Sequence, residues 1–270
     1  RQNIHCDNNN NHNNKMFPTL YNHFESPYHG DSRAQSSSSH QPSHPTKRTQ
    51  DPIVTGTSIL GIKYDGGVLL AADTLGSYGS LARFRSLERL KAVGSTTIVG
   101  ASGEYSDFQY IQKLLEDLTV HDYNSDDGVE HTPQEIFQYL VRVMYQRRNK
   151  FDPLWNALVI AGVDPTNNQP ILGVTDMVGT HYFDETIATG FGGYLAQPIL
   201  RKFVDEKKKR AEPITEDEAR KKLEECMKVL FYRDARTINK IQIARVDKTG
   251  THIDQPYEVE TTWVYKSDRD

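Results

Sequence analysis

The chain has 270 residues, of which 36% are hydrophobic, and a formal net charge of −4. This length predicts one domain, or one domain with a tail, and the slightly acidic balance does not favour nucleic acid as a partner. Two cysteines form no disulfide framework, which favours a reducing compartment, the cytoplasm or the nucleus. No apolar run approaches the ~18 residues of a membrane span, so we expect no membrane partner.

Residues 1–48 form a low-complexity segment with an Asn-rich run, a serine run and six of the ten histidines. A segment so poor in aliphatic residues cannot bury enough apolar surface to offset its ordering entropy. We therefore expect a disordered propeptide or tail. The histidines match no fixed ligand set, so neither a metal nor a cofactor is expected.

Two short apolar runs, residues 58–62 and 68–72, flank the dipeptide Asp65-Gly66. This is a strong hairpin signal. The hairpin places Thr57 at the start of its first strand and Asp73 at the end of its second.

The rest of the chain alternates between groups of strands and groups of helices. Three capping-box patterns, beginning at Ser106, Thr132 and Thr215, predict helix starts. We expect strands at 96–101, 156–163, 170–176, 180–184, 237–246 and 251–257, and helices after each box and at 194–204. Strands and helices segregated in this way favour an α+β fold, a four-layer αββα sandwich, over a doubly wound parallel sheet.

Several residues carry a resemblance to a known family. A Gly-Thr junction at Thr57, Asp73 sixteen residues later, Gly103 after a strand and Asp234 ahead of another resemble the β subunits of the 20S proteasome, which are N-terminal-nucleophile hydrolases. Residues 76–86, 145–162, 187–190 and 230–236 narrow the resemblance to the seventh member of the β ring. The resemblance implies a β-subunit domain at 49–256, and as partners the other α and β subunits of a 28-subunit barrel that carries out ATP- and ubiquitin-dependent degradation.

In active members of that family, a Thr hydroxyl attacks the scissile carbonyl and its own free α-amine takes up the proton. A Lys, two Asp, two Ser and a Gly amide that stabilises the oxyanion complete the site. The resemblance maps these roles onto Thr57, Asp73, Arg89, Gly103, Phe191, Asp234 and Thr237.

Three of these positions depart from the active pattern. Arg89 replaces the Lys, and a guanidinium cannot share a proton as an ammonium can. Phe191 and Thr237 stand at the Ser positions. We therefore predict a non-catalytic subunit in which Arg89 pairs with Asp73 and holds the hairpin rigid. The alternatives are an active threonine endopeptidase with Thr57 as nucleophile, freed by cleavage after Gly56, and a free-standing amidohydrolase of the same fold.

Two further predictions concern the ends of the domain. The resemblance implies processing between Arg48 and Thr49, which leaves residues 49–56 in front of Thr57. Residues 257–270 form a C-terminal extension whose first part alternates like a strand, with Tyr257, Trp263 and Tyr265 on one side. We expect these aromatic residues to be interface anchors, because the domain's own core needs no further strand. In related subunits this tail reaches the opposite β ring.

Overall fold

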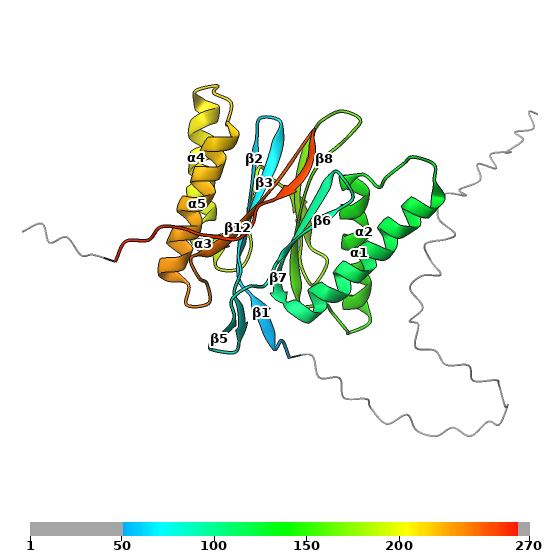
Figure 1. Cartoon of the computed structure of the whole chain (residues 1–270), viewed down its shortest axis with the longest axis horizontal. Helices are drawn as coiled ribbons and strands as arrows, with labels where there is room; N and C mark the ends of the chain where they lie inside the picture. The colour runs from blue at the N-terminus through cyan, green and yellow to red at the C-terminus, as the bar shows by residue number, and fades with distance from the viewer. Residues whose placement is uncertain (1–50, 264–270) are drawn as a thin grey trace, which may run out of the picture. The chain divides into compact units, whose positions relative to one another are not determined.

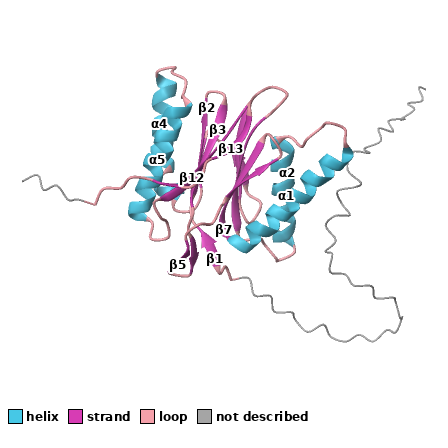
Figure 2. Cartoon of the chain, viewed as in Figure 1, coloured by secondary structure: helices cyan, strands magenta, loops and turns pink. Residues whose placement is uncertain are grey.

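Two antiparallel sheets formed by residues 51–263 face one another, and helices cover the outer face of each (Figure 1). The computed structural model describes these residues, so the predictions for residues 1–48, for Thr49 and for Tyr265 lie outside the described part. The four layers confirm the predicted α+β sandwich, and Figure 2 shows the strands between the two helical layers.

The first sheet has a long central part and two short outer strands. In spatial order it contains β10 (His181–Phe183), β9 (Pro170–Thr175), β8 (Asn156–Val163), β7 (Thr97–Glu104), β1 (Val54–Gly56), β4 (Gly76–Tyr78) and β5 (Leu81–Phe84), and β6 (Leu90–Val93) also pairs with β7. The helices α1 (Tyr105–Ser125) and α2 (Pro133–Asn149) pack on it.

The second sheet is built around the predicted hairpin. It contains β11 (Thr186–Ala188), β2 (Ile59–Tyr64), β3 (Gly67–Asp73), β12 (Lys240–Asp247) and β13 (Gly250–Ile253), and β14 (Tyr257–Glu258) pairs with β12. The helices α3 (Gly192–Leu195), α4 (Gln197–Lys209) and α5 (Glu216–Arg233) lie on its other side, opposite the first sheet (Figure 1).

The alternation along β2 separates the two halves of the core. Leu60 and Ile62 pack among residues of α4 and α5, whereas Ile59 packs between the sheets with Val159 and Leu172. All five side chains are fully buried. Successive side chains of a strand point to opposite faces, so each residue of this hairpin contributes to one of two apolar layers.

Short sequence patterns predicted the hairpin turn and the starts of two helices. The hairpin turn at Asp65-Gly66 is confirmed, with Gly66 at a φ of 96°. The capping boxes at Thr132 and Thr215 are also confirmed. The box expected at Ser106 is wrong, because Glu104 is the N-cap of α1 and its carboxylate accepts from the Ser106 amide.

The short strands were not predicted. Strand β1 was expected only as an extended lead, and β4, β5, β6 and β11 were missed. All four residues of β5 are exposed, and the other missed strands have three or four residues each. Segments this short show no alternation that separates them from a loop.

The start of the C-terminal extension belongs to the domain itself. Strand β14 pairs with β12, Val259 is buried in the layer under α5, and the Tyr257 hydroxyl donates to the Glu224 carboxylate over 2.6 Å. The expectation that the core needs no further strand is therefore wrong for residues 257–259.

Beyond Val259 the chain runs along the end of α5. The Tyr232 hydroxyl accepts from the Thr262 amide over 2.8 Å and donates to the Thr262 carbonyl over 3.3 Å. The Trp263 ring lies edge-on to Tyr232 and Phe231, with centroid distances of 5.0 and 5.7 Å. Trp263 is nevertheless 70% exposed, so a large aromatic surface remains open to solvent at this point.

Candidate active site

The predicted site residues come from separate elements and meet at one end of the β2–β3 hairpin. Thr57 lies between β1 and β2, Asp73 ends β3, and Asp234 follows the last residue of α5. Arg89 precedes β6, and Gly103 is in the last part of β7. Asp73, Arg89 and Asp234 are all buried.

Arg89 is the centre of this cluster, and only 2% of it is exposed. Its Nε donates to the Asp73 carbonyl at 3.1 Å, and its Nη1 donates to the carbonyls of Thr57 at 2.8 Å and Ala101 at 3.3 Å. Its Nη2 donates to the Ser58 carbonyl at 3.2 Å and forms an ion pair with the Asp73 carboxylate. A guanidinium has five N–H donors, so each has an acceptor.

These bonds give Arg89 a structural role across the two sheets. Its acceptors lie next to β2, at the end of β3 and in β7, so one side chain joins strands of both sheets. The predicted pairing with Asp73 is confirmed. A guanidinium held in this way has no donor left for a substrate.

The Asp73 carboxyl is enclosed by the same cluster. Burial raises its pKa above the ordinary value, while the Arg89 guanidinium and the backbone amides of Leu75 and Ile238 oppose that shift. The Leu75 amide donates to the carboxylate at 3.2 Å. Asp73 is thus bound to its neighbours on the hairpin and faces no open space.

The hydroxyl of Thr57 points into this cluster, but Thr57 has no free α-amine, the base that the resemblance assigns to active proteasome β subunits. Its Oγ1 donates to Asp234 Oδ2 over 2.6 Å, and the other oxygen of Asp234 accepts from the Arg236 amide at 2.9 Å. The nitrogen of Thr57 is in the peptide bond with Gly56, and a peptide nitrogen is not a base. In this chain the carboxylate of Asp234 is therefore the hydroxyl's acceptor.

The residues before Thr57 occupy the groove between β4 and β7. Strand β1 pairs with both, placing Thr55 opposite Ser77 on one side and Gly56 opposite Gly103 on the other. A Cβ on Gly56 would lie 2.4 Å from Arg89 Cδ, so the strand passes directly against the guanidinium side chain. The backbone edge of Gly103 on this side, which the resemblance assigns to an oxyanion, faces the chain's own strand.

Comparison with known proteins agrees with this architecture. A family model described as proteasome subunit matches residues 53–246. The chain belongs to the proteasome subunit family. It is similar to proteasome subunit beta type-4 of Xenopus laevis, with 47% identity over 219 residues that cover 81% of this chain and 88% of the relative.

Further relatives from distant eukaryotes have similar coverage. Proteasome subunit beta type-4 of Arabidopsis thaliana is 50% identical over 222 residues, covering 82% of this chain and 87% of the relative. Proteasome subunit beta type-7 of Saccharomyces cerevisiae is 44% identical over 232 residues, covering 83% of this chain and 86% of the relative. The resemblance to proteasome β subunits inferred from motifs is confirmed by these matches.

The backbone conformation and the close packing at position 103 require a glycine. Its φ is 94°, and a Cβ at this position would lie 2.0 Å from the Trp155 carbonyl oxygen. That carbonyl accepts from the Glu104 amide at 2.9 Å, so it cannot move aside without breaking a hydrogen bond. The glycine therefore has a structural reason that is independent of oxyanion binding.

The two residues that the resemblance places at serine positions differ in burial. Thr237 is buried beside the Asp73 carboxyl, as expected. Phe191 is 57% exposed and its ring contacts Tyr194, so it adds nothing to the cluster. The amide of Gly192, the residue after Phe191, donates to the buried hydroxyl of Ser58 at 2.8 Å.

Sequence reasoning also missed Thr189 and Glu104. The hydroxyl of Thr189 accepts from the Ile59 amide at 2.9 Å, and the Glu104 carboxylate accepts from the amides of Ile53 and Val54. These bonds join residues at least 50 positions apart. The pattern Glu104-Tyr-Ser106 just before a helical period was the available signal for Glu104, because acidic residues often cap helices.

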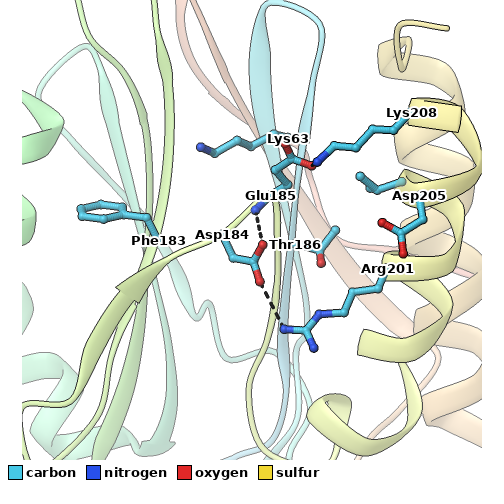
Figure 3. Close-up of a pocket in the computed structure, with 9 residues that line it drawn as sticks. Lys63, Phe183, Asp184, Glu185, Thr186, Arg201, Asp205 and Lys208 are labelled. Carbon is cyan, nitrogen blue, oxygen red and sulfur yellow. Dashed lines mark hydrogen bonds and ion pairs between the residues drawn. The ribbon is translucent and has the colours of Figure 1, made fainter. Parts of the chain in front are cut away.

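A separate hollow of about 390 Å³ lies at the other end of the hairpin (Figure 3). Its charged groups are mostly paired with one another. Arg201 bonds to Asp184 at 3.2 Å and Lys208 to Glu185 at 2.6 Å, while burial lowers the pKa of Lys63. Its lining contains none of the predicted site residues.

Within residues 51–263, no group of His, Cys, Asp and Glu side chains has the arrangement of a metal site. None of the described helices has the length and apolar character that crossing a membrane requires.

Proposed function

We propose that this chain is a non-catalytic β subunit of the 20S proteasome core. In this role it supports assembly of the rings and of the 28-subunit particle that degrades proteins by the ATP- and ubiquitin-dependent route in cytoplasm and nucleus. The observation that carries the proposal is the bonding of Arg89, which uses all five donors on neighbouring groups at the position of the family's Lys.

The chemistry of the cluster supports this role. A Thr hydroxyl is a weak nucleophile unless a base with a pKa near neutrality takes its proton, and an α-amine, with a pKa of about 7.7–8.0, has this property. In the intact chain that amine is absent, and strand β1 fills the space in front of Thr57. Arg89 donates to the Thr57 carbonyl, and a guanidinium is not a base that can take the place of the missing amine.

The direct test is Thr57→Ala in the assembled particle. We expect every peptidase activity of the particle to be unchanged and native electrophoresis to show normal assembly. In parallel, an epoxyketone that requires a free N-terminal Thr amine should label other subunits of the same preparation and leave this chain unlabelled. Loss of one peptidase class with assembly intact, or labelling of this chain, would count against the proposal.

One observation favours an active endopeptidase as the second candidate. The Thr57 hydroxyl is 2.6 Å from Asp234, and Asp73 is at the position of the family's orienting Asp. That function requires cleavage between Gly56 and Thr57. N-terminal sequencing of the chain from purified particles separates the two candidates: a start at Thr49 supports the first and a start at Thr57 the second.

The C-terminal extension supports an assembly role of this subunit. Residues 257–259 belong to the domain's own sheet, but Trp263 presents a mostly exposed indole next to α5. We propose that the segment from Trp263 onward, including Tyr265, contacts the opposite β ring. Deletion of residues 260–270, which leaves β14 and Val259 in place, should cause half-particles to accumulate on native gels. Normal rates of particle formation would contradict this role.

A further inference from the structure

Glu104 is a buried carboxylate that has no basic partner within residues 51–263. It is 7% exposed and lies at the end of β7, directly before α1. A buried charge is costly unless other groups satisfy its oxygens. The groups bonded to Glu104 therefore show what it holds in place.

Its acceptor oxygens bind two elements that are far apart in the sequence. Oε2 accepts from the amides of Ile53 and Val54, the latter over 3.1 Å. Oε1 accepts from the Ser106 hydroxyl over 3.0 Å and from the Ser106 amide over 3.4 Å. One carboxylate thus fixes the entry to β1 and caps the N-terminus of α1.

The backbone of Glu104 is itself fixed. Its amide donates to the Trp155 carbonyl over 2.9 Å, and its carbonyl accepts from the side-chain amide of Asn156 over 2.8 Å. The carboxylate is therefore presented to β1 from a rigid part of the first sheet. A side chain on such a support loses little further conformational freedom when it binds.

Strand β1 has few other means of holding its place. It has three residues, and its pairing covers two residue pairs with β4 and two with β7. At its C-terminal end Gly56 lies against Arg89, whereas at its N-terminal end Ile53 is 58% exposed and only the carboxylate holds its amide. Removing that carboxylate leaves the amide of Ile53 without its hydrogen bond and weakens the hold on the first half of β1.

We propose that Glu104 is a positioning residue that locks residues 53–56 into the groove between β4 and β7. This bonding keeps the chain's own strand paired with both β4 and β7. Within residues 51–263, Ile53 has the first backbone amide that a buried side chain holds. The inference rests on the proposed non-catalytic function in one respect, because residues 53–56 stay attached only if the chain is not cleaved before Thr57.

The test is hydrogen exchange of the full chain carrying Glu104→Ala or Glu104→Gln. We expect the amide of Val54 to exchange at least about tenfold faster in Glu104→Ala, the effect of losing a hydrogen bond to a charged group. Glu104→Gln retains the volume and one acceptor oxygen, so it keeps the fold and gives a smaller increase. Thermolysin followed by intact mass should detect cleavage before Val54 in Glu104→Ala and not in the unaltered chain.

Ser106→Ala is the matched control, because it removes a partner of Glu104 on α1 and leaves the bonds to Ile53 and Val54. It should leave exchange in β1 unchanged. Unaltered exchange of Val54 in both Glu104 variants would overturn the proposal. Equal acceleration throughout β1 and α1 in Glu104→Gln would also overturn it, because the residue would then act only as a helix cap.

Discussion

A basic residue lies at each end of the β2–β3 hairpin, and the two residues are held very differently. Arg89 lies at the end near Thr57, almost fully buried, with five acceptors for its five donors. Lys63 lies near the turn, half-buried in a hollow, and forms no ion pair with any residue from 51 to 263.

Comparing the partners of Lys63 and Arg89 shows when a buried charge stabilises the fold. Asp184 and Glu185 attract Lys63, but their carboxylates bond to Arg201 and Lys208 (Figure 3). The environment of Lys63 is open to solvent and adaptable. Arg89 is almost fully buried and all of its donors are bonded, so its end of the hairpin tolerates little change.

The largest expected effect is that of Arg89→Met. It leaves the Asp73 carboxylate buried without its cation, which costs about 3–5 kcal/mol of stability. Urea unfolding of the full chain measures it. Arg89→Lys should also be destabilising and should create no peptidase activity, because three donors cannot satisfy five acceptors and Thr57 keeps its peptide bond. Recovery of activity in Arg89→Lys would show that the guanidinium alone silences the site.

The second largest expected loss of stability is that of Gly103→Ala, which we compare with Gly66→Ala at the other end of the hairpin. Gly103→Ala places a Cβ 2.0 Å from a hydrogen-bonded carbonyl at a φ of 94°. We expect a loss of about 3 kcal/mol, the upper part of the usual range for overpacking. Gly66→Ala is the matched control, because its φ is 96° and no atom lies within 4 Å of the added Cβ. It should cost only the backbone strain, about 1 kcal/mol. Equal losses measured by thermal unfolding would mean that packing at Gly103 does not matter.

The third effect concerns Lys63 itself. Lys63→Met removes an ammonium that burial already disfavours, and the hydrophobic stem is retained. The free energy of unfolding should change by less than about 1 kcal/mol, as for other solvent-accessible charges. A loss as large as that of Arg89→Met in the same urea titration would break the comparison between the two ends.

The smallest expected effect is that of Glu218, which belongs to the capping box at the start of α5. The Lys207 ammonium, which bonds to Glu218 at 2.7 Å, lowers the pKa of that carboxyl to about 2. A lowered folded-state pKa stabilises the protein above the ordinary value of 4.5, and this contribution is lost as the pH falls toward 2. Glu218→Gln should therefore flatten the pH dependence of the melting temperature in this acidic range. An unchanged slope would show that the pair contributes nothing.

The sequence predicted what depends on neighbouring residues. The Asp65-Gly66 turn and the boxes at Thr132 and Thr215 are signals that span only a few residues, and the pairing of Arg89 with Asp73 was predicted from the resemblance to proteasome β subunits. The sandwich could be predicted because long strands and helices are segregated along the chain.

The contacts that close the site could not be predicted in this way. Arg89 binds backbone carbonyls, and a carbonyl has no signature in the sequence. Glu104 meets β1 because β7 brings it there, across 50 positions from Val54. The Gly192 amide donates to the hydroxyl of Ser58, which lies 134 positions away in the sequence, whereas Phe191 was expected at a serine position of the site. Such contacts depend on the packing of the whole sandwich.

The C-terminal end of α5 connects two distant parts of the chain mechanically. Asp234 receives the Thr57 hydroxyl, and two residues earlier Tyr232 holds the backbone of Thr262. The entry to the first core strand and the final described residues are therefore fastened to the same turn of one helix. A force that pulls on Thr262 reaches Thr57 through a few covalent bonds and two side chains, without crossing either sheet. The beginning and the end of the domain cannot be displaced independently.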